Sequence, residues 1–170
     1  MALTTVPVEL ASLDGAVTVN ESSADADFRV ESGGNANMLL VDGGNDTVVV
    51  GQSAPDTTVS GGTPAFQVIG SGFNGSGAFI RRQANQYAPS VMLAKSRSVS
   101  VGSHTIVQDD DEIGGIIFIG DDGTDLDTYG ATITAVVNGT PSNNNMPADL
   151  EFATNSGTSS PTLNMKLTKD

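Results

Sequence analysis

The sequence predicts an all-β fold without a convincing helix. Twenty of its 170 residues are glycine, and these lie with many Ser, Thr and Asn residues between short apolar runs. The runs are rich in Val and Ile, which favour strands over helices. Hydrophobic residues make up 38% of the chain and aromatic residues 5%, with no tryptophan, so one large core would be poorly supplied. We therefore expect short strands joined by tight turns, in one ordinary domain or two small modules.

Residues 1–26 have a mixed texture, with the short Val/Leu runs TTVPVELASL and GAVTVNESS. Pro7 has no amide hydrogen, so the first run is at most an edge strand or an extended arm. The opening MALTTVPVEL has neither a basic n-region nor an apolar h-region, and we predict no signal peptide. We interpret residues 1–26 as an arm that attaches the chain to another protein.

Residues 27–84 are predicted to form short strands that are interrupted by Gly-rich turns. The expected strands lie within DFRVESGG (27–34), NMLLVDGG (37–44), DTVVVGQSAP (46–55) and AFQVIGSG (65–72). The first and the last share Phe-x-Val before a Gly/Ser turn, which is a weak internal repeat. At the turn after the second run, we expect Gly43 and Gly44 to have positive φ, where a β-carbon is costly.

Residues 85–170 carry a denser set of expected strands, connected by segments rich in turn residues. The strands are SVMLAKS (90–96), HTIVQ (104–108), GGIIFIG (114–120), ATITAVV (131–137), DLEFAT (149–154) and TLNMKLT (162–168). This number of strands in so short a region is typical of a small antiparallel β-sandwich.

Several of these runs alternate between apolar and other residues, as half-buried strands do. One face of residues 131–137 would carry Ala131, Ile133, Ala135 and Val137. Leu150 and Phe152 would share a face of the next strand. In the last strand, the expected buried stripe consists of Leu163, Met165 and Leu167.

Carboxylates cluster at residues 109–112 and 121–127, and oxygen-rich acidic loops are what calcium prefers. The spacing is not that of an EF-hand, so we interpret them as acidic surface loops, with incidental divalent-cation binding as the alternative. His104 is the single histidine, no Gly-x-Ser-x-Gly elbow is present, and cysteine is absent. We therefore predict no catalytic residue, no metal ligand, no cofactor and no enzymatic activity.

The chain is strongly acidic, with 20 Asp and Glu against 7 Lys and Arg and a net charge of −13. This charge argues against nucleic acid or an anionic membrane as a partner, because phosphate groups bind cationic surfaces. No apolar stretch approaches the roughly 18 residues that would indicate a membrane span. The basic residues Arg81, Arg82, Lys95 and Arg97 form either a partner-facing or self-pairing surface, or scattered solubilising charges and ion pairs with the Asp runs.

Short strands with so few core residues bury too little surface alone, since even a two-stranded unit is marginal in water. Three identical chains wound together would solve this problem, because each would lend its apolar side chains to a common core. Side chains expected to meet their symmetry mates on the shared axis are Phe28, Val30, Leu39, Val41 and Val48. We therefore expect a homotrimer.

ADFRVESGGNANMLLVDGGNDTVVVG resembles a segment of the tail fibres of tailed bacteriophages and of related virion proteins. The chain from ANQYAPSVMLAKSR onward resembles the module that often follows it, upstream of a C-terminal intramolecular chaperone. The shared pattern lies at 89–97, 101–102, 114–125, 131–133, 137–141 and 146–154. The resemblance covers roughly residues 25–168 and implies parallel homotrimers with β-helical shafts and β-sandwich-like domains.

Together these observations predict a non-enzymatic structural protein of a phage virion. Residues 1–26 would be the virion-attachment arm, 27–84 a short trimeric β-helical or β-prism shaft, and 85–170 a distal β-sandwich. The protein would be a tail or head fibre that contacts the host surface, where a cell-surface glycan is a possible partner. The alternatives are a capsid decoration protein that stabilises the shell and a carbohydrate-binding module.

Overall fold

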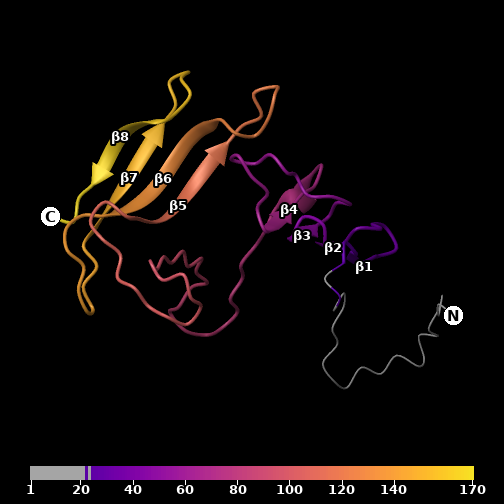
Figure 1. Ribbon diagram of the computed structural model, residues 1–170, viewed down its shortest axis with the longest axis horizontal. Helices are drawn as coiled ribbons and strands as arrows, with labels where there is room; N and C mark the ends of the chain where they lie inside the picture. Colours follow the sequence, from indigo (N-terminus) through magenta and orange to yellow (C-terminus); the bar gives the residue numbers. More distant parts are fainter. Residues whose placement is uncertain (1–21, 23) are drawn as a thin grey trace. The chain divides into compact units, whose positions relative to one another are not determined.

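The computed structural model describes residues 22 and 24–170, and it confirms the all-β fold (Figure 1). The predicted attachment arm, residues 1–26, therefore lies almost entirely outside the described residues. The chain forms two compact units. The N-terminal unit is described up to Pro55 and also contains Pro64–Ser76, and the C-terminal unit contains Asp56–Thr63 and Gly77–Asp170. The predicted division into a shaft at 27–84 and a β-sandwich at 85–170 stays a prediction.

The N-terminal unit contains a four-stranded sheet, which confirms the four strands expected in this part of the chain. Its strands are β1 (Phe28–Val30), β2 (Leu39–Asp42), β3 (Thr47–Val50) and β4 (Phe66–Val68). They are adjacent in this order; β1–β2 and β2–β3 are antiparallel, and β3–β4 is parallel. A single turn of 3-10 helix, η2 (Phe73–Gly75), follows β4. The parallel step requires a crossover, and residues 51–65 supply it.

One face of this sheet is covered by its own loops. Leu40 and Val49 pair directly in the register and are only 2% and 0% exposed. The β2–β3 turn beside them is held by the carboxylate of Asp42, which accepts hydrogen bonds from the Gly44 amide (3.0 Å) and the Asn45 amide (2.8 Å). A further bond from the Asn45 side chain does most to lower the pKa of Asp42. A local polar cap thus fixes the register of two very short strands.

The expectation of positive φ at Gly43 and Gly44 is wrong, because the left-handed residue of this turn is Asp46 (φ 54°). The two glycines are needed for a different reason. The preceding chain passes so close that a β-carbon at Gly43 would lie 2.8 Å from the Ala26 carbonyl oxygen. A β-carbon at Gly44 would lie 2.7 Å from Oδ1 of Asp25.

The C-terminal unit is built on a second four-stranded sheet, antiparallel throughout. Its strands are β5 (Glu112–Ile119), β6 (Tyr129–Val137), β7 (Ala148–Thr154) and β8 (Thr162–Leu167). They are adjacent in sequence order, and they confirm the last four of the six strands expected between residues 85 and 170.

The two other expected strands, 90–96 and 104–108, are wrong, since neither joins a sheet. Residues 85–170 therefore contribute one sheet, and the second layer of the expected sandwich is not formed by these segments. Val91 and Leu93 nevertheless lie over the sheet, where they line a hollow with Gly114, Ile133 and other side chains of β5, β6 and β7. The backbone there has no neighbouring strand.

The alternation predicted for β6 and β7 is confirmed by the register. One row across the sheet is Ile116, Ile133, Phe152 and Met165, and the next is Gly114, Ala135, Leu150 and Leu167.

The buried stripe expected in β8 is wrong. Leu163, Met165 and Leu167 are all about half exposed. A register shift beside Asn164 also pairs Leu163 with Ala153, whose side chain points to the opposite face from that of Phe152.

Replacing Gly43 by Val should lower the free energy of unfolding by about 1–3 kcal/mol, because the chain at Ala26 must move. Gly34→Val is the matched control, since a β-carbon at Gly34 meets nothing within 4 Å; it should change stability by less than about 0.5 kcal/mol. Thermal melting followed by circular dichroism measures both. Equal melting of the two variants would contradict the close-approach explanation.

Gly114→Ala should also destabilise the protein by about 1–3 kcal/mol, because the new β-carbon would lie 2.7 Å from Cβ of Leu93. The neighbouring Gly115→Ala meets only ordinary contacts, the nearest at 3.5 Å, and should leave stability unchanged or raise it by about 0.5–1 kcal/mol. Denaturant titration of both variants tests whether residues 91–93 rest on the sheet. A Gly114→Ala variant as stable as the parent would show that they do not.

Candidate assembly surfaces

The outward face of the N-terminal sheet is entirely apolar. We call it the N-terminal apolar face; its residues are Phe28, Val30, Leu39, Val41, Val48, Val50, Phe66 and Val68. Phe28, Val41, Val48 and Phe66 form one continuous row across all four strands. Phe66 is 63% exposed. The five residues that the sequence assigned to a shared core thus lie on one face, where Phe28, Val30 and Val41 are exposed and Leu39 and Val48 are half-buried.

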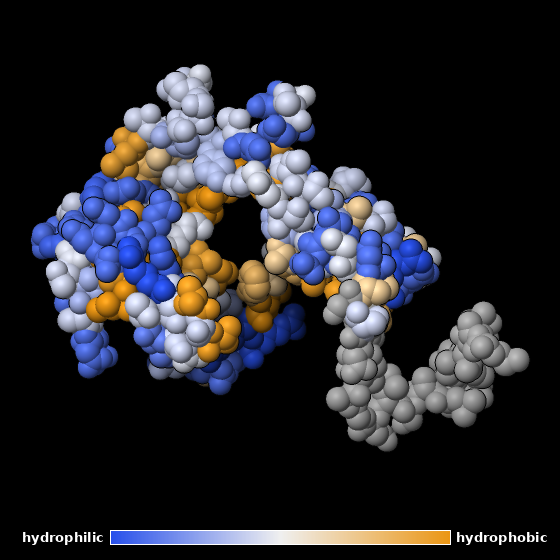
Figure 2. Space-filling view, viewed as in Figure 1, coloured by the Kyte–Doolittle hydropathy of each residue, from blue (hydrophilic) through white to orange (hydrophobic). Residues whose placement is uncertain are grey.

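The C-terminal sheet has a similar surface. We call it the C-terminal apolar face; its residues are Gly114, Ile116, Phe118, Ala131, Ile133, Ala135, Leu150, Phe152, Met165 and Leu167. Part of it forms an open hollow of about 260 Å³ beneath Val91 and Leu93. Figure 2 shows several separate hydrophobic patches, in orange, on this unit, which lies on the left of the view. Ile116, Phe118 and Met165 each remain about half exposed.

Few apolar side chains are removed from water within one copy. Among the described residues, the buried hydrophobic ones are Leu40, Val49, Val107 and Val137. A buried core residue usually contacts many others of its kind, and most large apolar side chains here have solvent on at least one side. Contiguous exposed apolar patches of this sort mark interaction surfaces.

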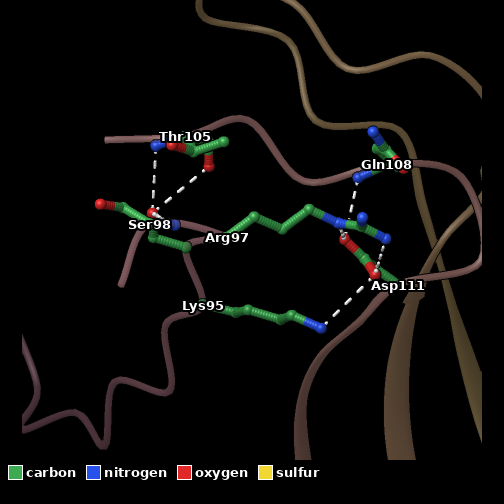
Figure 3. A network of polar contacts seen from close by, with 7 residues as sticks. Lys95, Arg97, Ser98, Thr105, Gln108 and Asp111 are labelled. Atoms are coloured by element: carbon green, nitrogen blue, oxygen red, sulfur yellow. Dashed lines mark hydrogen bonds and ion pairs between the residues drawn. The ribbon is translucent and has the colours of Figure 1, made fainter. Parts of the chain in front are cut away.

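A carboxylate clamp holds the chain that precedes β5 (Figure 3). Asp111 is 8% exposed and accepts two bonds from the Arg97 guanidinium, at 2.7 Å from Nε and 2.8 Å from Nη2. Nζ of Lys95 lies 3.4 Å from the same carboxylate, and the Gln108 amide donates to it at 2.9 Å. Of the two readings of the basic residues, ion pairing with an Asp run is confirmed for Lys95 and Arg97.

This clamp keeps Asp111 ionised. Hydrogen bonding from Arg97, supported by the Gln108 amide, holds the pKa of Asp111 far below its usual range. Arg97 also donates its amide to the Thr105 carbonyl at 3.2 Å, so residues 95–97 and 105–111 are tied together. The clamp therefore orders two extended segments that have no strand partner.

A second buried carboxylate ties β7 to β8 and to the C-terminal residues. Asp149 is 2% exposed and lies 2.8 Å from Nζ of Lys166. It also accepts bonds from the Asn138 side chain (2.7 Å) and the Lys169 amide (2.9 Å). The Lys166 ammonium does most to lower the pKa of Asp149, and Asp149 in turn raises the pKa of Lys166.

In the acidic loop at 121–127, carboxylates accept hydrogen bonds from backbone amides of the same loop. Asp121 accepts a bond from the Gly123 amide at 2.7 Å, and Asp122 accepts bonds from the Thr124 amide at 3.0 Å and the Thr128 hydroxyl at 3.1 Å. Within the described part of the chain, no three His, Asp or Glu side chains come together as a group that could hold a metal ion. These carboxylates act as turn-forming groups.

The remaining polar candidates are dispersed. His104 is exposed, and its ring forms no hydrogen bond or ion pair with the residues that the structure describes. Of the two tyrosines, Tyr129 bonds to the Ser60 hydroxyl, and Tyr87 is exposed with the Arg81 guanidinium 5.5 Å from its ring centre. Across residues 22 and 24–170, no helix is long and apolar enough to cross a membrane.

Comparison of the chain with protein-family models and with curated protein sequences found no match.

Asp111→Asn should lower the melting temperature at pH 7 by several degrees, because Arg97 and Lys95 lose their charged partner. Since the folded pKa is depressed, the wild type has this stabilisation in full above the unfolded pKa of about 3.9. It is lost as the pH falls further, so the difference between wild type and variant should shrink below about pH 4. Melting curves from pH 7 to pH 2 measure it.

Asp110→Asn is the control, because Asp110 has a left-handed backbone (φ 66°) that asparagine tolerates. It removes the same charge from the same run without touching the clamp. Its melting temperature should stay close to the wild-type value at every pH, and an equal loss in both variants would contradict a specific role for Asp111.

Proposed function

We propose that this protein is a non-enzymatic structural component of a tailed-phage particle, a parallel homotrimeric fibre. The assignment to a virion is supported by the sequence resemblance over residues 25–168. The trimer is supported by a single physical observation: the N-terminal apolar face is continuous across four strands, and half of its side chains are exposed to solvent.

The three copies bury these faces against one another along a common axis. Phe28, Val41, Val48 and Phe66 then form one layer of the shared core, with Val30, Leu39, Val50 and Val68 as the next layer. Burying a large apolar side chain contributes about 1.5–3 kcal/mol, and three chains supply each layer threefold. Strands of three or four residues suffice in such a shaft, because the core depends on stacking between copies rather than on strand length.

Attachment and host contact are assigned to opposite parts of the chain. Residues 1–26 attach to other virion proteins, on the tail or on the head, and the β5–β8 unit is the distal part that contacts the host surface. Repeated weak contacts from such units add up by avidity. Fibre and shell-stabilising decoration protein differ in copy number, which quantitative mass spectrometry of purified particles relative to the major capsid protein would measure.

Light scattering should give a mass about three times 17.3 kDa for the purified chain. Phe66→Asp should abolish the trimer, because a carboxylate would enter each copy of the shared layer without a partner. Phe73→Asp is the matched control: Phe73 is 94% exposed in the same unit but lies in η2, outside the sheet. It should keep the trimeric mass.

A wild-type chain that is folded and monomeric at micromolar concentration would contradict the proposed trimer. A trimer that survives Phe66→Asp would leave oligomerisation intact but exclude the N-terminal apolar face as its core.

A further inference from the structure

The stretch from Val91 to Ala94 has the form of a strand without a partner. It lies outside every helix and turn, and none of its N–H or C=O groups bonds to any described residue. The side chains alternate: Val91 and Leu93 line the hollow over the C-terminal apolar face, and Met92 is 87% exposed on the other side. Such a stretch is one strand of a second layer whose neighbours are missing.

β8, at the edge of the sheet, also lacks a strand partner on one side. β8 is the last strand in the order, and all six of its residues are exposed. It contains no proline, and its one charged residue, Lys166, is already paired with Asp149 (2.8 Å) and Glu151 (3.0 Å). Apart from the register shift beside Asn164, the strand has none of the features that usually prevent an edge from pairing.

The two cannot meet within one copy. Leu93 rests over Gly114 of β5, and Lys95 and Arg97 are bound to Asp111 directly before β5. The hollow that Val91 and Leu93 line reaches Leu150 of β7, so these residues lie over the face of the sheet and not beside its β8 edge. Because β8 of the same copy belongs to the layer beneath them, a β8 strand that pairs with them in a second layer comes from another molecule.

We infer that β8 of a neighbouring copy pairs with Val91–Ala94. The neighbour's sheet then completes the second layer over the C-terminal apolar face and covers side chains such as Ile116 and Phe118, which are half exposed in a single copy. The contact joins two different surfaces, so three copies related by a threefold axis close it into a ring. This inference rests on the proposed trimer and adds to it: the β-sandwich expected from the sequence is formed between chains.

Disulfide cross-linking tests this pairing directly, because the natural chain has no cysteine. Met92→Cys is combined in turn with Leu163→Cys, Asn164→Cys and Met165→Cys, and each double variant is oxidised and run on a non-reducing denaturing gel. Side chains of directly opposed residues on paired strands have Cβ atoms about 4.5–5.5 Å apart, and three successive positions sample both faces of β8. At least one combination should convert most of the chain into covalent dimers and trimers.

Met146→Cys replaces Met92→Cys in the matched control, with the same three β8 partners. Met146 is also an exposed methionine of the C-terminal unit, but it lies in the loop before β7, and its combinations should stay as single chains. Cross-links in none of the Met92 combinations, cross-links equally in the controls, or a bridge closed within one chain would each overturn the inference.

Light scattering on the reduced double variants distinguishes an error in the proposed β8 pairing from an error in the proposed trimer. A trimeric mass without cross-links rejects only the pairing of β8 with residues 91–94, whereas a single-chain mass in the wild-type protein rejects both proposals.

Discussion

The constraint on which the rest of this structure depends is the small number of apolar side chains that one copy can bury. Ordering each residue costs about 1–2 kcal/mol of backbone entropy, and the hydrophobic effect normally offsets that cost. Here the described residues bury only Leu40, Val49, Val107 and Val137 among their large and mid-sized apolar side chains. Both sheets carry a continuous apolar face that is at least partly exposed, and the proposed trimer would bury it.

In this chain, carboxylates hold in place some segments that have few hydrogen bonds from neighbouring strands. Asp42 fixes a turn between two four-residue strands, Asp111 ties the extended segments before β5, and Asp149 joins β7 to β8. The last two are nearly fully buried and matched by Arg97 and Lys166. Removing one partner from such a pair is destabilising, because it leaves a buried charge uncompensated. A few ionic contacts can therefore hold segments that have few other contacts.

Those parts of the fold that depend on local pattern could be predicted from the sequence, and those that depend on distant partners could not. Short apolar runs between turn residues located β5 to β8. The five residues assigned to a shared core, Phe28, Val30, Leu39, Val41 and Val48, do lie on one face. Similar runs at 90–96 and 104–108 predicted strands wrongly, because a strand exists only where a second strand bonds to it. The contact between Gly43 and Ala26 likewise has no local signature, and turn statistics suggested positive φ instead.

The contacts of the candidate site also divide into those that could be predicted from local sequence and those that could not. Ion pairing of Lys95 and Arg97 with an Asp run could be foreseen from charge alone, but the choice of Asp111 among neighbouring acids required its burial to be known. The register shift in β8, which moves Leu163 away from the row of Phe152, could not be seen in a run that alternates without interruption.

The acidity of the chain bears on the proposed assembly. The net charge is −13, yet neither apolar face contains an Asp or Glu residue. The polar side of the C-terminal sheet carries Asp149, Glu151 and Lys166 instead. Five of the seven basic residues form ion pairs with carboxylates of their own chain: Arg29, Lys95, Arg97, Lys166 and Lys169. Little positive charge therefore remains to attract a neighbour's acidic surface. Like-charge repulsion therefore disfavours most ways in which two copies could meet, and it leaves the two uncharged faces and the unpaired β8 edge as the contacts without that penalty.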